Sequence, residues 1–506
     1  MSEEKEQAGP GVIGGPSFQT WRWVKIALGP ALFLLVELLF RPDPGTVDHP
    51  ELVRHALGAT LWIAAWWFTE ALPIPATSLL PIILFPLLGL ATTKEVAREY
   101  GHDIIFLFLG GFLLAIAMER TGLQERIAIR IIRIVGQGRR TLVLGFMVAT
   151  AVLSMWISNT ATTVMLLPVA LAMLATQERG VDEPAAKIDQ PFAVALLLGI
   201  AYAANIGGLG TPVGSPPNLI FQDIYHQKTG QEVSFLQWML YAVPVVLVLL
   251  PATWWMLVRR LSRGTVGVHE LPRFGPMSWG QWWVLSVFSV TVALWISRGD
   301  FVELQGWGAR LSEYGLELTD SSVAIAAAIV LFVVPRSRGN RAAILDWSVA
   351  PRLPWGVLLL MGAGFAISMA FDRSGLTVWI GAQLQALGGL PLPESIIFYV
   401  VLGAIVVVSI LITEFASNTA SASILLPIIF GISAALGPER FPPEILMVAC
   451  AVACTTGFAV PAGTPPNALV FATERISIGR FVRIGLLIDL LAVLIIVVVI
   501  GGRQSV

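Results

Sequence analysis

Two polar motifs interrupt long apolar stretches of this sequence. SNTATTVMLLP begins at Ser158, and SNTASASILLP begins at Ser417. Ser, Asn and Thr side chains donate and accept hydrogen bonds without carrying charge. If a helix starts at each motif, its free backbone N–H groups carry partial positive charge and add further donors. Such a combination is suited to binding an oxyanion.

The same interruptions can hold a small cation. The hydroxyls of Ser154, Ser158, Thr413 and Ser417, together with carbonyls of unwound backbone, are hard oxygen ligands. No Lys or Arg lies near either motif in the sequence, so a bound dianion would be costly without accompanying cations. We therefore expect cation-coupled binding of a substrate with a carboxylate at each end. Helix capping alone would explain one such motif better than a duplicated set.

Three pairs of matching blocks indicate an internal duplication. Besides the SNT pair, ERTGL at Glu119 matches DRSGL at Asp372, and GSPPN at Gly214 matches GTPPN at Gly463. The blocks keep the same order at a nearly constant offset, so chance is a poor explanation. Each PPN block lies in an apolar stretch, where proline and glycine predict unwound backbone at membrane depth.

The composition places these motifs in a membrane. The chain has 506 residues, of which 56% are hydrophobic and only 13% are charged, whereas a soluble domain has about 25% charged residues. We predict an all-α polytopic membrane protein with about 11 transmembrane helices and two re-entrant helical hairpins. The hairpins are expected at 141–176 and 395–437. The expected spans are 24–40, 55–72, 74–91, 103–118, 191–224, 237–258, 279–296, 321–335, 355–371, 445–472 and 481–500.

The distribution of arginines predicts the orientation. Arginines gather in connections such as 120–140 and 259–263, which the positive-inside rule assigns to the cytoplasm. The N-terminus is then cytoplasmic and the C-terminus outside, and the hairpins enter from opposite sides. The two copies are therefore inverted repeats, which is typical of secondary transporters that bind substrate near the membrane midplane. We also expect an amphipathic interfacial helix within 120–140.

At these motifs the sequence resembles the divalent anion/sodium symporter family. The resemblance rests on WWFTEALPIPATSLLPIILFPLLGL from Trp66, FLGGFLLAIAMERTGL from Phe108, both SNT motifs and both PPN blocks, and it covers nearly the whole chain. It implies a homodimer in the cell (inner) membrane that takes up succinate, malate, fumarate or related anions with sodium. It also implies a scaffold domain and a transport domain that moves like an elevator.

The resemblance divides the chain into seven segments. We expect a disordered cytoplasmic tail at 1–20, scaffold helices at 21–119 and 261–371, interfacial connectors at 120–140 and 372–394, and transport subdomains at 141–260 and 395–506.

Carried over by motif, the resemblance also implies the site residues. The first sodium site would use Ser154, Ser158, Asn159 and Gly214, and the second Thr413, Ser417, Asn418 and Gly463. The substrate would meet Asn159, Thr160, Asn418 and Thr419, with Ser215, Thr464 and Pro465 nearby. Ser154 and Ser215 of the first copy correspond to Thr413 and Thr464 of the second, so the two sodium sites need not be equivalent.

Several alternatives stay open at the level of sequence. The carboxylate of Glu70 has either a functional role or a capping role, and Glu414 either biases cation binding or braces its hairpin. The carrier is either a sodium symporter or a sodium-independent exchanger, with sulfate or a tricarboxylate as other possible substrates. An anion channel remains a weaker alternative.

An intramembrane enzyme is disfavoured because the chain lacks an H-E-x-x-H motif and a serine placed with a histidine base. Neither an organic cofactor nor a nucleic-acid partner is expected.

Overall fold

The computed structural model describes residues 16–43, 45–136, 138–177, 190–262, 264, 272–300, 305–339, 342–384 and 393–505. Most of the tail predicted at 1–20, namely 1–15, lies outside these residues, and so does 385–392 of the connector predicted at 372–394. Within the described residues the regular secondary structure is helical, without a strand. This confirms the predicted all-α class.

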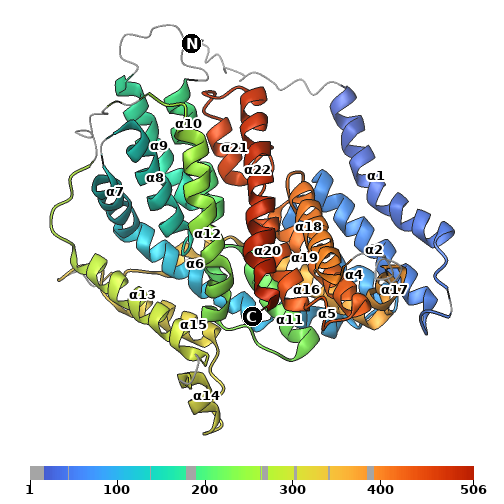
Figure 1. Cartoon of the computed structure of the whole chain (residues 1–506). Coiled ribbons are helices and arrows are strands. Elements are labelled where there is room, and N and C mark those ends of the chain that lie inside the picture. Colours follow the sequence, from blue (N-terminus) through green and yellow to red (C-terminus); the bar gives the residue numbers. More distant parts are fainter. Residues whose placement is uncertain are drawn as a thin grey trace, which may run out of the picture.

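Long helices form one bundle, and the two predicted hairpins flank its central helices (Figure 1). The helices of the N-terminal half are α1 (Pro16–Leu39), α2 (Pro50–Thr69), α3 (Ile74–Thr77), α4 (Leu80–Leu87), α5 (Thr93–Glu99), α6 (Asp103–Thr121), α7 (Leu123–Val135), α8 (Arg139–Ser154), α9 (Asn159–Gln177), α10 (Pro191–Gly208), α11 (Pro216–Thr229) and α12 (Phe235–Val258). Those of the C-terminal half are α13 (Trp279–Arg298), α14 (Trp307–Ser312), α15 (Asp320–Val333), α16 (Trp355–Ser374), α17 (Leu376–Leu384), α18 (Glu394–Thr413), α19 (Asn418–Leu436), α20 (Pro443–Cys454), α21 (Pro465–Phe471) and α22 (Ile478–Gly501).

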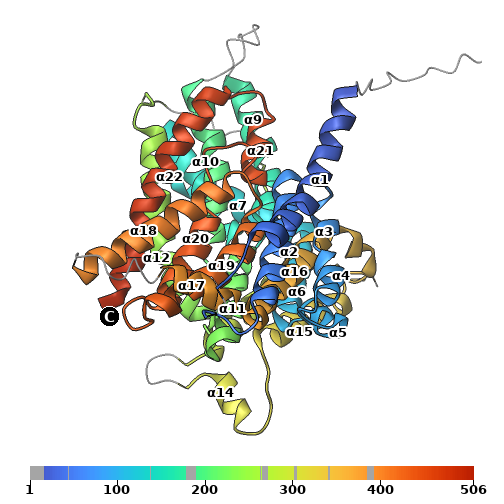
Figure 2. The same ribbon diagram turned by 90° about the vertical axis from the view of Figure 1, so that its right-hand side faces the viewer.

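Among the described residues, 8 helices are long and apolar enough to cross a membrane. Large apolar side chains are also exposed on the outside of the bundle, including Leu38 on α1, Leu247 on α12 and Val498 on α22. A soluble protein rarely exposes so much apolar surface, whereas lipid covers it at no cost. The helix α1 lies at the edge of the bundle beside α2 (Figure 2).

One predicted span is wrong. The apolar stretch 74–91 was expected to form a single span, but the structure divides it into α3 and α4. Pro81 explains the break, because in a continuous helix its ring would clash with the carbonyl of Thr77 and it has no N–H to donate.

Both predicted hairpins and both predicted helix breaks are present. The hairpin α8–α9 turns at 155–158, and α18–α19 turns at 414–417. The first broken helix consists of α10, a 3-10 turn at Pro212–Gly214 and α11, and the second consists of α20 and α21. Nearly all of α10 and all of Ile445–Cys454 in α20 are buried. A helix buried on every side is apolar all round, so these two helices can form the centre of the bundle.

The ERTGL and DRSGL blocks have the same local structure. Gly122 ends α6 with φ 68° and leads into α7, and Gly375 ends α16 with φ 76° and leads into α17. Left-handed backbone favours glycine, which explains why both copies keep it. The amphipathic helix predicted within 120–140 is present as α7, which buries Ile129 and Ile132 and exposes Ile134.

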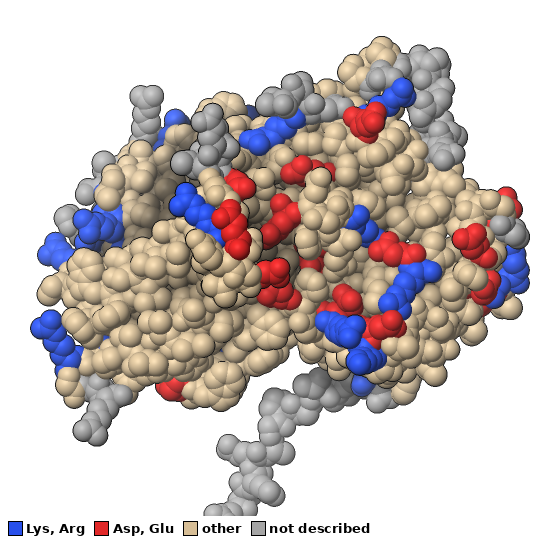
Figure 3. Space-filling model, turned by 90° about the horizontal axis from the view of Figure 1, so that it is seen from below, with Lys and Arg blue, Asp and Glu red and all other residues tan. Residues whose placement is uncertain are grey.

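Charged side chains concentrate at the ends of the bundle. Figure 3 shows the end near α5, α11 and α14, where Asp and Glu gather around the centre of the face with Lys and Arg beside them. Several of these charges join neighbouring elements. Lys228 of α11 pairs with Asp372 of α16, and Arg298 of α13 pairs with Asp320 of α15 at 2.6 Å.

Candidate substrate and cation site

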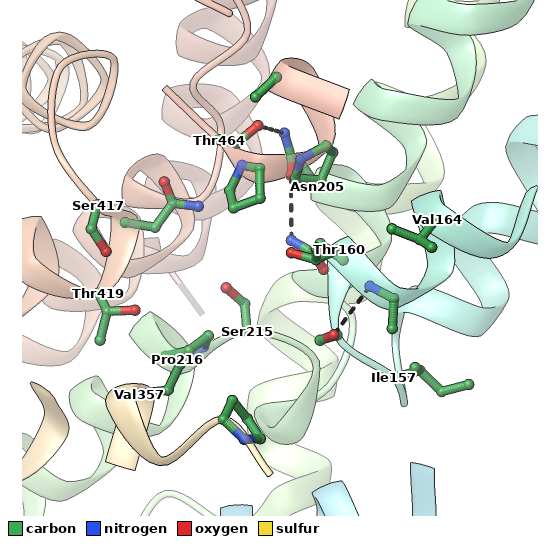
Figure 4. A pocket seen from close by; sticks show the side chains of 18 of the residues that line it. Ile157, Thr160, Val164, Asn205, Ser215, Pro216, Val357, Ser417, Thr419 and Thr464 are labelled. Atoms are coloured by element: carbon green, nitrogen blue, oxygen red, sulfur yellow. Dashed lines mark hydrogen bonds between the residues drawn. The ribbon is translucent and has the colours of Figure 1, made fainter. Parts of the chain in front are cut away.

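The two SNT turns, here called the first and second tips, face one cavity of about 1370 Å³. In Figure 4, Thr160 of the first tip lies on one side of the opening, Ser417 and Thr419 of the second tip lie on the other, and Ser215 lies between them. Both PPN breaks border the same space. The predicted residues on its wall are Ser158, Asn159, Thr160, Gly214, Ser215, Ser417, Asn418, Thr419, Gly463, Thr464 and Pro465.

Helix starts surround the cavity. The helix α9 begins at Asn159, α19 begins at Asn418 and α11 begins at Pro216. Ser158 Oγ accepts a hydrogen bond from Ala161 N at 3.3 Å, so the first tip caps its own helix. The N-terminal N–H groups of α9 and α19 direct partial positive charge toward the space between the tips. Pro216 and Pro217 have no N–H, so the first two residues of α11 add no donors. An anion bound there would be stabilised without a formal positive charge.

Ser154 and Thr413 lie behind the tips and do not line the cavity. Ser154 Oγ lies 2.6 Å from Asn159 Oδ1 and 2.7 Å from the carbonyl oxygen of Ala204. Its single proton can serve only one of these two acceptors. A cluster of three oxygens with one proton is suited to a hard cation.

The second tip repeats this arrangement. Thr413 Oγ1 lies 2.8 Å from Asn418 Oδ1 and 2.7 Å from the carbonyl oxygen of Cys454. Both hydroxyl-bearing residues are fully buried. The Ser-to-Thr difference between the copies therefore leaves the oxygen geometry unchanged.

Two glycines leave space among oxygen atoms beside the tips. A Cβ added to Gly214 would lie 2.6 Å from Gly208 O and 3.0 Å from Met155 O. One added to Gly463 would lie 3.1 Å from Glu414 O and 3.2 Å from Val460 O. We call these spaces the first and second cation pockets. Carbonyl oxygens lining a space that a side chain would fill fit a sodium ion.

Paired asparagines hold the PPN breaks in shape. Asn218 Nδ2 donates to Gly208 O at 2.9 Å and to Thr211 O at 2.8 Å. Asn467 Nδ2 donates to Gly457 O at 3.1 Å, in the same position of the second copy. The Oδ1 atom of each asparagine is buried without a hydrogen-bond partner, which leaves an unused oxygen beside each break.

Sequence reasoning missed Asn205 and Thr455, which join the two copies. Asn205 Nδ2 donates to Thr464 Oγ1 at 2.9 Å, and Asn205 Oδ1 accepts from Asn159 Nδ2 at 3.4 Å (Figure 4). At the corresponding position, Thr455 Oγ1 lies 3.2 Å from Ser215 Oγ. The one signal in the sequence was an amide within the apolar run AYAANIGG.

Glu414 and Glu70, whose roles the sequence left open, have different surroundings. Glu414 is buried, and its carboxylate accepts hydrogen bonds from Ala459 N at 2.7 Å and Val460 N at 2.6 Å. It therefore braces the second break against the second tip. Glu70 ends α2 in left-handed backbone (φ 48°) and is exposed on the cavity wall.

The wall of the cavity away from the tips carries charge. Lys25, Glu119, Glu125 and Arg352 line it there, and Arg352 pairs with Glu119. No Lys or Arg among the described wall residues belongs to a tip or a break. The cavity also reaches Gly122 and Gln124 at the junction of α6 and α7, so it extends from the tips to the arginine-rich side of the chain.

Comparisons with known proteins agree on the class of molecule. A family model described as the sodium:sulfate symporter transmembrane region matches residues 21–503. The sodium-dependent dicarboxylate transporter SdcS of Staphylococcus aureus strain MRSA252 is 41% identical over 497 residues, covering 96% of this chain and 91% of that protein. SdcS of strain NCTC 8325 / PS 47 is 40% identical with the same coverage.

One solved structure shares the fold. The crystal structure of the Alcanivorax borkumensis YdaH transporter matches with a TM-score of 0.55 and 18% sequence identity. The match covers 79% of this chain and 84% of that chain. At this identity the likeness concerns the arrangement of the helices alone.

Proposed function

Because this chain belongs to the sodium:sulfate symporter family of membrane transporters, we propose that it imports C4-dicarboxylates such as succinate, malate and fumarate together with sodium. One observation carries the proposal: both SNT tips and both PPN breaks border a single cavity. A substrate with a carboxylate at each end can meet one tip with each carboxylate. The relative SdcS, named a sodium-dependent dicarboxylate transporter, supports the same substrate class.

The substrate is held by neutral donors in this account. Asn159 and Thr160 bind one carboxylate, Asn418 and Thr419 bind the other, and Ser215, Thr464 and Pro465 complete the wall. Transferring a dianion into a site without cationic side chains costs several kcal/mol or more unless cations enter with it. Two sodium ions would neutralise the substrate.

Sodium occupies the two cation pockets. The first ion is held by Ser154, Ser158, Asn159 and Gly214, and the second by Thr413, Ser417, Asn418 and Gly463. The oxygen clusters behind the tips and the spaces beside the glycines support this assignment. Because Asn159 and Asn418 serve both ion and substrate, an empty pocket would leave the substrate donors poorly placed.

Alternating access uses an elevator motion in a homodimer. The scaffold comprises 21–119 and 261–371, the transport subdomains comprise 141–260 and 395–506, and connectors at 120–140 and 372–394 join them. The two transport subdomains are inverted repeats, with the N-terminus cytoplasmic and the C-terminus outside. The cavity reaches the arginine-rich side, which supports an inward-facing conformation in this orientation.

Flux measurements on purified protein in liposomes test the proposal. Labelled succinate uptake is followed under an inward sodium gradient, with potassium substituted, and in liposomes preloaded with unlabelled succinate. We expect uptake that requires sodium and does not require internal succinate. Uptake that ignores sodium but needs internal succinate would identify an exchanger. Uptake of sulfate but not of succinate would overturn the substrate assignment.

A further inference from the structure

The two cation pockets differ in one side chain. Aligning the motifs LSMWISNT and ITEFASNT places Met155 opposite Glu414, immediately after Ser154 and Thr413. The backbone carbonyl at this position borders the pocket in both copies. The side chain is a neutral thioether in the first copy and a carboxylate in the second.

The Glu414 carboxylate lies at the second pocket. Its Oε2 atom is 3.1 Å from the position that a Cβ on Gly463 would take, as close as the carbonyl oxygen of Glu414 itself. In the first copy, Met155 packs instead against Gly210, where a Cβ would lie 2.6 Å from Met155 Cε. The second pocket therefore has an oxygen that the first pocket lacks.

Glu414 is buried, and the described polar groups around it include no basic side chain. Its carboxylate oxygens accept hydrogen bonds from two backbone N–H groups, Ala459 N and Val460 N. The neighbouring polar groups are Asp489 of α22, whose carboxyl hydrogen-bonds to Glu414 and accepts from Phe458 N at 3.0 Å, and Tyr202 of α10, which donates to Phe458 O at 3.2 Å. Among the described residues neither Glu414 nor Asp489 forms an ion pair with a Lys or Arg.

A buried carboxylate without a positive partner is unfavourable. A cation in the second pocket would supply that partner, whereas the first pocket offers a cation only neutral oxygens. We infer that the second pocket is the high-affinity sodium site and that Glu414 is the positioning residue that makes the two sites unequal. This inference rests on the proposed function, because it takes sodium as the ion bound at both pockets.

Sodium binding to the purified protein without substrate tests the inference. Equilibrium binding of radiolabelled sodium and sodium-dependent thermal stabilisation are measured in a choline buffer. For the unmodified protein we expect two classes of site. Glu414→Gln is expected to weaken the tighter class about 10–100-fold, as loss of a supporting partner typically does, and to leave the weaker class unchanged. Glu317→Gln, which removes an exposed carboxylate outside the cavity, is the matched control and should leave both classes unchanged.

Two results would overturn the inference. One is a folded Glu414→Gln variant with both classes at their original affinities, and the other is an equal loss in both classes. If Glu414→Gln does not fold, Glu414→Asp decides the question, because it keeps a carboxylate but withdraws it from Gly463 by one methylene. Weaker sodium binding by the tighter class supports the inference, and unchanged binding contradicts it. Absence of any sodium binding by the unmodified protein would instead contradict the proposed function.

Discussion

At the scale of single residues, the proposed site makes Asn159 and Asn418 the link between ion binding and substrate binding. The Oδ1 atom of each faces the hydroxyl cluster behind its tip, while each residue also lies on the wall of the shared cavity. A cation that fixes this oxygen fixes the orientation of the whole amide. The donors offered to the substrate would then be in place only when sodium is bound, which is a direct physical basis for coupling.

The glycines of the cation pockets should not tolerate a side chain. Gly214→Ala and Gly463→Ala each place a methyl group among the carbonyl oxygens of a pocket. We expect each change to weaken sodium binding about 10–100-fold, measured as sodium-dependent thermal stabilisation. Gly403→Ala is the control, because a Cβ there meets nothing within 4 Å, and unchanged binding is expected. Normal sodium binding by both pocket variants would show that the ions lie elsewhere.

Asn205 should contribute to substrate affinity although it was not recognised from sequence. Asn205→Ala leaves Thr464 Oγ1 and Asn159 Nδ2 without their buried partner, which costs about 1–3 kcal/mol. We expect a KM for succinate raised about tenfold and a smaller change in kcat. Ser297→Ala, which loses a hydrogen bond within α13 only, serves as the control. An unchanged KM would mean that the link between the two copies does not support the site.

At the scale of elements, most of the architecture was predictable, since apolar length and proline–glycine breaks depend on local sequence. The hairpins, both breaks and the α6–α7 junction followed from such patterns. The break within 74–91 was not predicted, because the prediction followed the high hydropathy of the whole stretch and gave too little weight to Pro81. The sequence left two roles open for Glu414, because its partners, the amides at 459 and 460, approach it only in the folded bundle. Asn205 was missed for the same reason.

Two ion pairs connect the helix α11 to neighbouring segments. The Lys228 side chain is only 5% exposed and pairs with Asp372 of α16, whose side chain is 46% exposed. His102, just before α6, pairs with the buried Asp223 of α11 at 2.9 Å. These contacts join segments that we assign to the transport subdomain with segments at the scaffold.

Replacing Asp372 should reduce the stability of the protein more than replacing its ion-pair partner Lys228. Asp372→Asn leaves a buried ammonium unpaired and is expected to cost about 1–3 kcal/mol of stability, reduced from the fully buried case because Asp372 is half exposed. Lys228→Met leaves only a solvated carboxylate and should cost less. Thermal unfolding of both single variants and the double variant in detergent measures the coupling. If the two single variants lose equal stability and the double variant loses the sum of the two, the ion pair does not contribute to stability.

At the scale of the whole molecule, the position of the cavity supports the proposed orientation in the membrane. It reaches the α6–α7 junction and the arginine-rich side of the chain, which the positive-inside rule assigns to the cytoplasm. In the proposed transport cycle, a cavity that opens toward the cytoplasm, with ion pairs at the opposite end of the bundle, would be the inward-facing state.

Accessibility to a thiol reagent tests this orientation. Val164 lines the cavity and is 51% exposed, whereas the native Cys450 and Cys454 are fully buried and should not react. We expect Val164→Cys to be labelled by a membrane-impermeant reagent in inside-out vesicles, with protection by sodium plus succinate. Cys introduced at the exposed Tyr314 should react in right-side-out vesicles. The reverse pattern would contradict the assigned orientation.

The central claim is that the two tips together form one sodium-coupled site. Sodium-driven succinate uptake by Asn159→Ala and by Asn418→Ala, each compared with Gly403→Ala in the same liposomes, tests it most directly. The account predicts that either single change at a tip abolishes uptake and that the control transports normally. Uptake that persists in one of the two tip variants with unchanged sodium dependence would contradict a site shared between the tips.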